Sequence, residues 1–371
     1  MSLFSFLKKN RQSYSLVFNI GSGSVSGGVV RFTEAPGENV TFYAKENITF
    51  QEEIDISKHL DLMKSALTTL ASKIQKGGPK KIDRVFYIFS SPWSVSQTKV
   101  IKIKENKAFK ITESYLNNII EEQEKNFQTE IAKTGKIIEK KIIQVKINGY
   151  LVNDFYNKTT KELELSVFFT VVPENILNTV EDAVSKTFIP GEVWCHSLIL
   201  ATQSVINDLF PQKEDFISME VSEEITDISI VKNNVMISSA SIPLGRNDFM
   251  RALSKELNVT EEIADSQIKM HGSNSNDELG NMKLSVAMDK AGLDWITKIS
   301  EIFSSFKEKI YVPDSVFMIA DPDLFVFLKN KIEKQDFKVV VLDNKKIRPP
   351  IPGNDLIFKI ELMFLDNIYK I

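Results

Sequence analysis

The sequence has few of the residues that build covalent or metal-based sites. Among its 371 residues there is one cysteine, Cys195, and there are three histidines, His59, His196 and His271. A single cysteine excludes an internal disulfide, so a reducing compartment fits best. Cys195 lies in an apolar run, Val193 to Ala201, which we interpret as buried core rather than as the surroundings of a reactive thiol. The histidines have no spacing that predicts a metal site or a catalytic triad, so we expect each to be structural or exposed.

An excess of charge of either sign is also absent. The chain has 46 Lys and Arg against 49 Asp and Glu residues, a formal net charge of -3, and Lys and Glu are mixed along it. We therefore expect no basic face and no nucleic acid partner. With 43% hydrophobic and 26% charged residues, the composition is that of a globular chain long enough for a bilobed body.

Long apolar runs are missing as well. No stretch approaches the roughly 18 to 20 residues that a membrane-spanning helix needs, and the N-terminus lacks the pattern of a secretory signal. We therefore expect a cytoplasmic protein. The segment Met1 to Arg11 combines Leu and Phe with Lys and Arg, which would let it lie on an anionic membrane surface. A frayed terminus that packs locally is the alternative.

Two strand-turn-strand patterns of similar design are present. The first runs from Tyr14 to Phe32 around a glycine and serine turn, Gly21 to Ser24. Extended residues follow its glycines, whereas a Rossmann or P-loop turn would be followed by a helix. The second runs from Phe216 to Val231 around Ser222 to Glu224, and a further strand, Val235 to Ile242, comes after it. Two such hairpins in two halves indicate an internal duplication.

The segment between the hairpins has a pattern of its own. An extended run (Val95 to Ile103), an amphipathic helix (Thr112 to Phe127) and two strands (Lys141 to Asn148, Glu162 to Val172) predict an inserted subdomain. The other predicted helices and strands complete an α/β body. We divide the chain into a first lobe (1–90 and 173–215), an inserted subdomain (91–172), a second lobe (216–348) and a closing C-terminal helix (349–371).

This order of elements resembles the actin-like ATPase superfamily, and within it the branch of the division protein FtsA and the pilus protein PilM. The resemblance covers nearly the whole chain, and it implies a bilobed, ribonuclease H-like α/β fold with an inserted strand-helix-strand-strand subdomain. Its strongest parts are Asn19 to Val25, similar to the first phosphate hairpin of the family, and Glu220 to Asp227 with Ile242 to Gly245, similar to the second. By this resemblance the vestigial nucleotide site consists of Asn19, Gly21, Ser22, Gly23, Ser24, Glu220, Ser222, Thr226, Asp227 and Ala320.

The sequence departs from the family where metal and phosphate would bind. Asn19 stands in place of an aspartate that orients magnesium, and an amide carries no charge to hold a hard cation. Ser222 to Glu224 replace three glycines that let backbone amides approach phosphate. The two carboxylates add a repulsion of roughly 3 kcal/mol per charge pair at an effective dielectric near 20. The stretch Phe317 to Pro322 lacks the glycine pair under the adenosine, and we expect Asp321 to face the nucleotide.

These departures predict a degenerate ATPase with no catalytic residues and no metal. The predicted cofactor is none, or ATP with magnesium bound weakly through the parts of both hairpins that survive. An alignment shifted by one residue, with a working site, is the alternative.

Three functions stay open. The favoured one is an FtsA-like scaffold, peripheral at the inner face of the membrane, that binds a tubulin-like division protein and self-associates. The second is a PilM-like pilus assembly protein that holds a short peptide of a membrane protein in a groove between the first lobe and the insert. The third, an active ATPase or kinase, needs a carboxylate base and magnesium ligands where Asn19, Glu223 and Glu224 stand. The last helix, Leu356 to Ile371, is apolar nearly all round, which indicates a buried closing helix rather than an FtsA-type membrane anchor.

Overall fold

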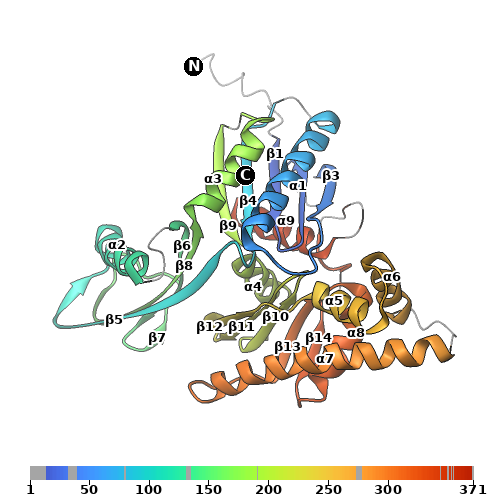
Figure 1. Ribbon diagram of the computed structural model, residues 1–371. Helices are drawn as coiled ribbons and strands as arrows, with labels where there is room; N and C mark the ends of the chain where they lie inside the picture. The colour runs from blue at the N-terminus through green and yellow to red at the C-terminus, as the bar shows by residue number, and fades with distance from the viewer. Residues whose placement is uncertain are drawn as a thin grey trace.

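The computed structural model describes residues 14–31, 40–78, 81–130, 135–189, 191–272, 278–342, 344–348, 351, 353 and 355–369. These residues form three sheets with helices packed against them (Figure 1). None of the helices within these ranges is both long enough and apolar enough to cross a bilayer. The segment Met1–Arg11, for which we predict membrane-surface binding, lies outside the described residues.

The first lobe is a five-stranded sheet covered by helices on both faces. In spatial order its strands are β3 (Val40–Asn47), β2 (Ser24–Val30), β1 (Ser15–Ile20), β4 (Arg84–Phe89) and β9 (Glu192–Ser197). Helices α1 (Ile56–Gly77) and α3 (Glu174–Ser185) pack on one face, and α4 (Leu198–Leu209) and α9 (Leu356–Ile368) pack on the other. Because both faces are covered, β1 and β4 are apolar along most of their length instead of alternating.

The second lobe repeats this plan. Its strand order is β12 (Val235–Ile242), β11 (Thr226–Lys232), β10 (Phe216–Val221), β13 (Ser315–Ala320) and β14 (Lys338–Val341). Strand β1 pairs antiparallel with β2 and parallel with β4, and β10 pairs in the same two ways with β11 and β13. The matching topology supports the internal duplication that the two hairpins indicate.

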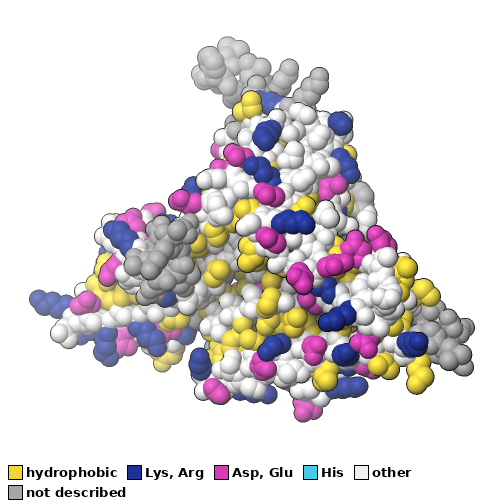
Figure 2. Space-filling model, in the orientation of Figure 1, with side chains coloured by type: hydrophobic (Ala, Val, Ile, Leu, Met, Phe, Trp, Pro, Cys, Tyr) yellow, Lys and Arg dark blue, Asp and Glu magenta, His cyan; other side chains and the backbone are white. Residues whose placement is uncertain are grey.

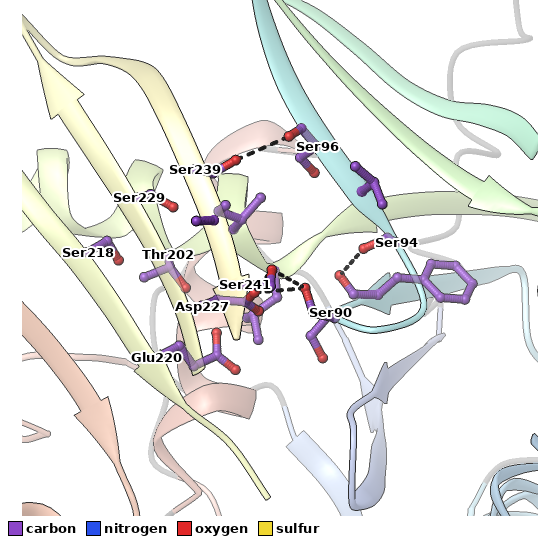
Figure 3. Close-up of a pocket in the computed structure, with 16 residues that line it drawn as sticks. Ser90, Ser94, Ser96, Thr202, Ser218, Glu220, Asp227, Ser229, Ser239 and Ser241 are labelled. Atoms are coloured by element: carbon purple, nitrogen blue, oxygen red, sulfur yellow. Dashed lines mark hydrogen bonds between the residues drawn. The ribbon is translucent and has the colours of Figure 1, made fainter. Parts of the chain in front are cut away.

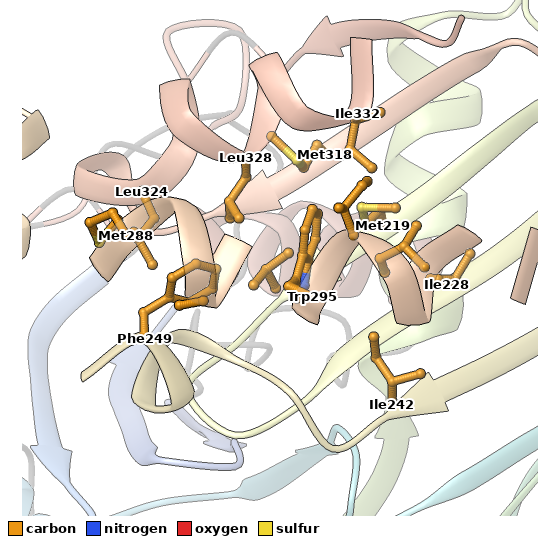
Figure 4. Packing of buried hydrophobic residues seen from close by; sticks show 14 of the residues in the cluster. Met219, Ile228, Ile242, Phe249, Met288, Trp295, Met318, Leu324, Leu328 and Ile332 are labelled. Atoms are coloured by element: carbon orange, nitrogen blue, oxygen red, sulfur yellow. The ribbon is translucent and has the colours of Figure 1, made fainter. Parts of the chain in front are cut away.

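The core of the second lobe is built around Trp295, which is 1% exposed. Helices α5 (Arg246–Leu257), α6 (Glu261–Gly272), α7 (Glu278–Lys307) and α8 (Pro322–Glu333) bring apolar side chains onto one face of the sheet (Figure 4). The Trp295 indole donates a hydrogen bond to Thr226 Oγ1 at 3.0 Å, and Thr226 donates to the Leu244 carbonyl at 2.6 Å. Thr226 therefore satisfies the buried indole and anchors the end of β12.

The inserted subdomain is a four-stranded antiparallel sheet with one helix. Its strands β5 (Val95–Lys110), β8 (Thr159–Pro173), β6 (Gly135–Ile147) and β7 (Tyr150–Leu151) lie in that order. Thr112 caps the N-terminus of helix α2 (Glu113–Glu130), because its hydroxyl accepts a hydrogen bond from the Tyr115 amide at 3.1 Å. Leu116, Ile120 and Phe127 of this helix pack on the sheet, and the subdomain projects from the side of the first lobe (Figure 1).

Helix α9 is buried between the two lobes. Phe358, Ile360, Leu362, Phe364 and Leu365 join a core that also contains Phe86 of the first lobe and Phe216 and Phe317 of the second. The helix begins at Asp355, which accepts hydrogen bonds from the Phe358 amide at 3.0 Å and from the Tyr43 hydroxyl at 2.6 Å. The prediction of a buried closing helix is confirmed by these contacts.

The apolar run around Cys195 is less buried than the sequence predicts. Strand β9 is the edge of its sheet, and Val193 and Trp194 are 44% and 43% exposed. Cys195 itself is half-buried, and burial raises the pKa of its thiol to about 12, which keeps it unreactive. Interpreting the whole run as core was therefore wrong, because an edge strand has a sheet neighbour on one side only.

On the face drawn in Figure 2, acidic and basic side chains are interspersed, with no broad area of one sign. This mixture matches the net charge of -3. Electrostatic steering toward a highly charged polymer would need a larger area of one sign.

Replacing Phe358 by Ala is expected to lower the free energy of unfolding by about 3–5 kcal/mol, because it leaves a cavity in the core shared by both lobes. Urea denaturation followed by circular dichroism measures the change. Ile368→Ala in the same helix is the control, since Ile368 is 38% exposed. Equal losses in the two variants would contradict the central position of α9.

Candidate functional site

The turns of the two hairpins meet between the lobes. Ser222 Oγ donates to the Ile225 carbonyl at 2.8 Å, so Ser22 Oγ donates to Ser222 Oγ across 2.9 Å. Ser22 Oγ also accepts from the Glu224 amide at 3.0 Å, and Ser24 Oγ donates to the Glu223 carboxylate at 2.8 Å. We call the three bonds that join the two turns, those of Ser22 with Ser222 and Glu224 and that of Ser24 with Glu223, the turn–turn contact. At about 1 kcal/mol each, they hold the lobes together with roughly 3 kcal/mol.

Glu223 fills the space between the two turns. A Cβ placed on Gly23 would lie 2.2 Å from the Cβ of Glu223, so only glycine allows this approach. Lys45 lies 3.8 Å from the Glu223 carboxylate and partly balances its charge. The predicted phosphate-facing turns are therefore in contact with each other, with an acidic side chain between them.

The first amides of helix α5 are also occupied. Arg246 N donates to the Ser222 carbonyl at 2.9 Å, and Asn247 N donates to the Glu223 carbonyl at 2.7 Å. A helix N-terminus attracts anions through such free amides. In this structure both amides donate to carbonyls of the second turn instead.

Glu224 is directed into the second lobe rather than between the turns. Its carboxylate lies 2.8 Å from Arg251 Nη2 and accepts from the Asn247 amide group at 2.6 Å. The expectation that both glutamates repel a phosphate is wrong for Glu224, because a guanidinium balances its charge. For Glu223, the repulsion of a phosphate stays a prediction.

Two side chains that sequence reasoning left without a role hold the first turn. His59 Nδ1 accepts from Gln51 Nε2 at 3.2 Å, which places the ring proton on Nε2, 2.7 Å from the Ser22 carbonyl. Trp93 stacks on the His59 ring and donates to the Gly21 carbonyl at 2.6 Å. A glycine turn with its carbonyls bonded in this way has a fixed conformation.

Buried acids lie beneath the turns. Asn19 Nδ2 donates to Glu361 Oε1 of helix α9. Glu361 is 0% exposed, and its Oε2 has no hydrogen-bond partner within the described part of the chain. Burial raises the pKa of Glu361 well above its ordinary value, and Asp355 and Glu220 raise it further, while the Asn19 bond lowers it. Sequence reasoning missed Glu361; the signal was one acid within the apolar run Leu356 to Leu365.

An ion pair also lies at the stretch Phe317 to Pro322, where the family has the glycine pair under the adenosine. Arg246 Nε lies 3.3 Å from Asp321 Oδ2, and its Nη2 lies 2.6 Å from Asp265 Oδ1. Asp321 thus lies beside a guanidinium that is 9% exposed, at the end of the strand that contains Ala320. That Asp321 would face a nucleotide stays a prediction; in this structure its carboxylate is paired with Arg246.

Two further residues of the predicted nucleotide site, Asp227 and Glu220, lie near the junction of the lobes. Asp227 accepts from Ser91 of the first lobe at 2.8 Å and from Ser241 of its own sheet. Glu220 of β10 lies directly opposite Asp227 of β11 in the strand register. In the first hairpin Asn19 of β1 lies opposite Ser26 of β2 in the same way. Across the residues that the structure describes, no three His, Cys, Asp or Glu side chains gather closely enough to hold a metal ion.

A second candidate site is a groove of about 450 Å³ between the insert and the first lobe. Consecutive residues of two strands line it, Lys136–Lys141 of β6 and Val193–His196 of β9, with Tyr369 at one end. At its base Glu139 accepts from His196 Nδ1 at 2.7 Å and from Ser197 Oγ at 2.8 Å, and His196 Nε2 lies 3.0 Å from the Tyr369 hydroxyl. The buried histidine is therefore structural, as predicted, and it joins the insert to the lobe.

The buried acids predict a pH dependence. In the folded protein the pKa of Glu361 is raised above its ordinary value of about 4.3. The contribution of Glu361 to the free energy of unfolding is therefore fully present below about pH 4.3, and it is lost as the pH rises through the folded pKa. Glu361→Gln keeps the acceptor for Asn19 and removes the ionisation. We expect it to stabilise the protein by about 1–3 kcal/mol at pH 8 and little at pH 5, measured by denaturant unfolding.

The matched control is Glu308→Gln, the same change at an exposed residue, which should leave the pH profile unchanged. Some pH dependence should persist in Glu361→Gln, because burial also raises the pKa values of Glu220 and Asp227. A profile identical to the unmodified protein would mean that Glu361 is not buried in solution.

Comparison with known proteins gives a structural match without a sequence match. No family model matches the chain, and no curated protein matches it. The structure titled PilM-PilN type IV pilus biogenesis complex superposes with a TM-score of 0.65 at 10% identity, covering 95% of this chain and 98% of that one.

Two further matches have TM-scores of 0.48. One is MreB 5 of Spiroplasma citri bound to AMPPNP, at 10% identity over 96% of this chain and 97% of that one. The other is a Bacteroides thetaiotaomicron protein with actin-like ATPase fold and unknown function, at 9% identity over 95% and 96%. The PilM superposition and the duplicated lobes together show that this chain has the bilobed actin-like fold.

Proposed function

We propose that this protein is a PilM-like assembly factor that binds a short extended segment of a membrane protein in the groove between β6 and β9. The observation that carries the proposal is the groove itself, which is bounded by the edge strand β9 and by the part of β6 that precedes its short pairing with β7. Among the described strands β9 has β4 as its one neighbour, and β6 pairs with β7 only through Lys146 and Ile147. Backbone groups along such edges can accept an added strand.

The side chains of the groove suit a peptide with alternating character. Trp194 and Val193 offer exposed apolar surface, which a single solvated strand would not need. Three lysines of β6 line the groove (Lys136, Lys140 and Lys141), so basic residues outnumber Glu139 and Glu181 there. We therefore infer a segment with apolar residues on one side and an acidic residue on the other.

The pilus hypothesis now stands ahead of the division scaffold that the sequence favours. What supports it is the superposition, at a TM-score of 0.65, with the structure titled PilM-PilN type IV pilus biogenesis complex, in which a pilus protein is in complex with a partner. A tubulin-like partner, self-association and a peripheral place at the inner membrane face remain proposals; in this scheme the membrane partner supplies the tether.

We also propose that the protein is a pseudo-ATPase. A nucleotide between the turns would have to break the turn–turn contact, displace Glu223 and compete with its negative charge. Losing three hydrogen bonds alone costs about 3 kcal/mol, which weakens binding by roughly a hundredfold.

Photo-crosslinking in the native cell tests the groove. With benzoylphenylalanine in place of Trp194, we expect a covalent adduct with one membrane protein, identified by mass spectrometry. The same replacement of Val326, an exposed residue of the second lobe, is the control and should give no such adduct. A tubulin-like protein captured at position 194, or equal adducts at both positions, would overturn the pilus proposal.

ATP titration tests the pseudo-ATPase proposal separately. The unmodified protein should show no phosphate release and no shift in melting temperature with millimolar magnesium-ATP. Glu223→Gly removes the side chain lodged against Gly23 and is expected to make ATP binding measurable by calorimetry. Turnover by the unmodified protein that Asp227→Asn abolishes would refute the proposal.

A further inference from the structure

A cavity of about 190 Å³ lies between the two lobes and the beginning of the insert (Figure 3). It is separate from the β6–β9 groove, and its residues come from β4, β5, α4 and the strands β10 to β12. A single buried water needs only about 10–15 Å³ of such space. The cavity therefore has room for a small molecule.

The wall from the second lobe is an ordered array of polar side chains. In register, Ser218 lies opposite Ser229, and Ser229 opposite Ser239. The next row is Glu220, Asp227 and Ser241. Side chains two residues apart share a face of a strand, so three adjacent strands present six polar groups to the cavity. The residues between them, such as Met219 and Ile228, face the apolar core of the lobe.

Hydroxyl groups also line the opposite wall. Ser90, Ser91, Ser94 and Ser96 come from the end of β4 and the beginning of β5, and Thr202 comes from α4. Two hydrogen bonds join the walls. Ser91 Oγ donates to the Asp227 carboxylate at 2.8 Å, and Ser239 Oγ donates to the Ser96 backbone carbonyl at 3.4 Å. The cavity is thus held by both lobes.

Two buried polar groups in this cavity have no partner. Glu220 is 8% exposed, and no hydrogen bond reaches its carboxyl group from any described residue. Thr202 is 2% exposed, and its Oγ1 is likewise without a hydrogen-bond partner in the described ranges. Both side chains line the cavity, where Figure 3 shows them. Leaving a buried polar group without a partner is unfavourable, and a ligand that bonds to it would remove that penalty.

The charges select the ligand. Two carboxyl groups line the cavity, and no Lys or Arg is among its lining residues. A phosphate or carboxylate would therefore meet two acidic groups there and no basic side chain to balance its charge. We propose that this cavity binds a small free organic cation with N–H donors, such as a primary ammonium, through Glu220, Thr202 and the surrounding serine hydroxyls.

Proton linkage supports this choice. Burial raises the pKa of Glu220 well above its ordinary value, and Asp227 and Glu223 raise it further; Glu361 of α9 is the other nearby acid. A bound cation favours the ionised carboxylate, so cation and proton compete for Glu220. Binding should tighten as pH rises toward the folded pKa.

Calorimetry on the full chain with three probes of similar size tests the proposal. Propylammonium, with charge and donors, is expected to bind saturably and more tightly at pH 8 than at pH 6. Propanol lacks the charge and tetramethylammonium lacks the donors, so neither should bind. Equal binding of propanol would identify a neutral polyol site, and equal binding of tetramethylammonium a nonspecific acidic one; either result overturns the proposal, as does no binding of propylammonium.

Two variants locate the site. Glu220→Gln should weaken propylammonium binding by about tenfold or more, since it removes the charge–charge contact. Thr202→Val should weaken it by about fivefold without loss of stability, because the removed hydroxyl has no partner in the unliganded protein. Glu308→Gln, the same change at an exposed residue outside the cavity lining, is the control and should bind propylammonium as well as the unmodified protein does. Unchanged affinity in both cavity variants would contradict the assignment.

Discussion

The turn–turn contact is the interaction on which the junction of the two lobes depends. Ser22 and Ser24 bond to the turn at Ser222–Glu224, and Gly23 permits the approach because a side chain there would collide with Glu223. The two lobes therefore touch directly, and the shared core of α9 adds apolar burial behind the contact.

This closure explains where ligands can still be accommodated. The space between the turns holds Glu223, the amides at the start of α5 serve the second turn, and Arg246 occupies the region beside Asp321. The groove along β6 and β9 and the cavity lined by Glu220 lie away from these contacts. With the turns in direct contact, the arrangement is consistent with the proposal that this protein acts by binding partners rather than by hydrolysing ATP.

Several side chains show how far local sequence carries a prediction. The two hairpins, the insert and the closing helix follow from periodicity and turn residues, and the predicted actin-like fold is confirmed. Glu224 was taken as a phosphate-repelling group because the resemblance puts it in place of a phosphate-facing glycine; Arg251, on helix α5, balances its charge instead. Val193 and Trp194 were assigned to the core because apolar character does not distinguish a central strand from an edge strand.

The sequence by itself determined the element order, the duplicated hairpins and the loss of glycines at Ser222–Glu224, because these are local properties of backbone preference and hydrophobic pattern. The tertiary structure alone decided that Asn19 meets Glu361, that His59 and Trp93 fasten the first turn, and that polar residues of three strands align around one cavity. Those contacts join residues as far as 342 positions apart, and no local rule encodes which distant side chain a fold brings opposite a given residue.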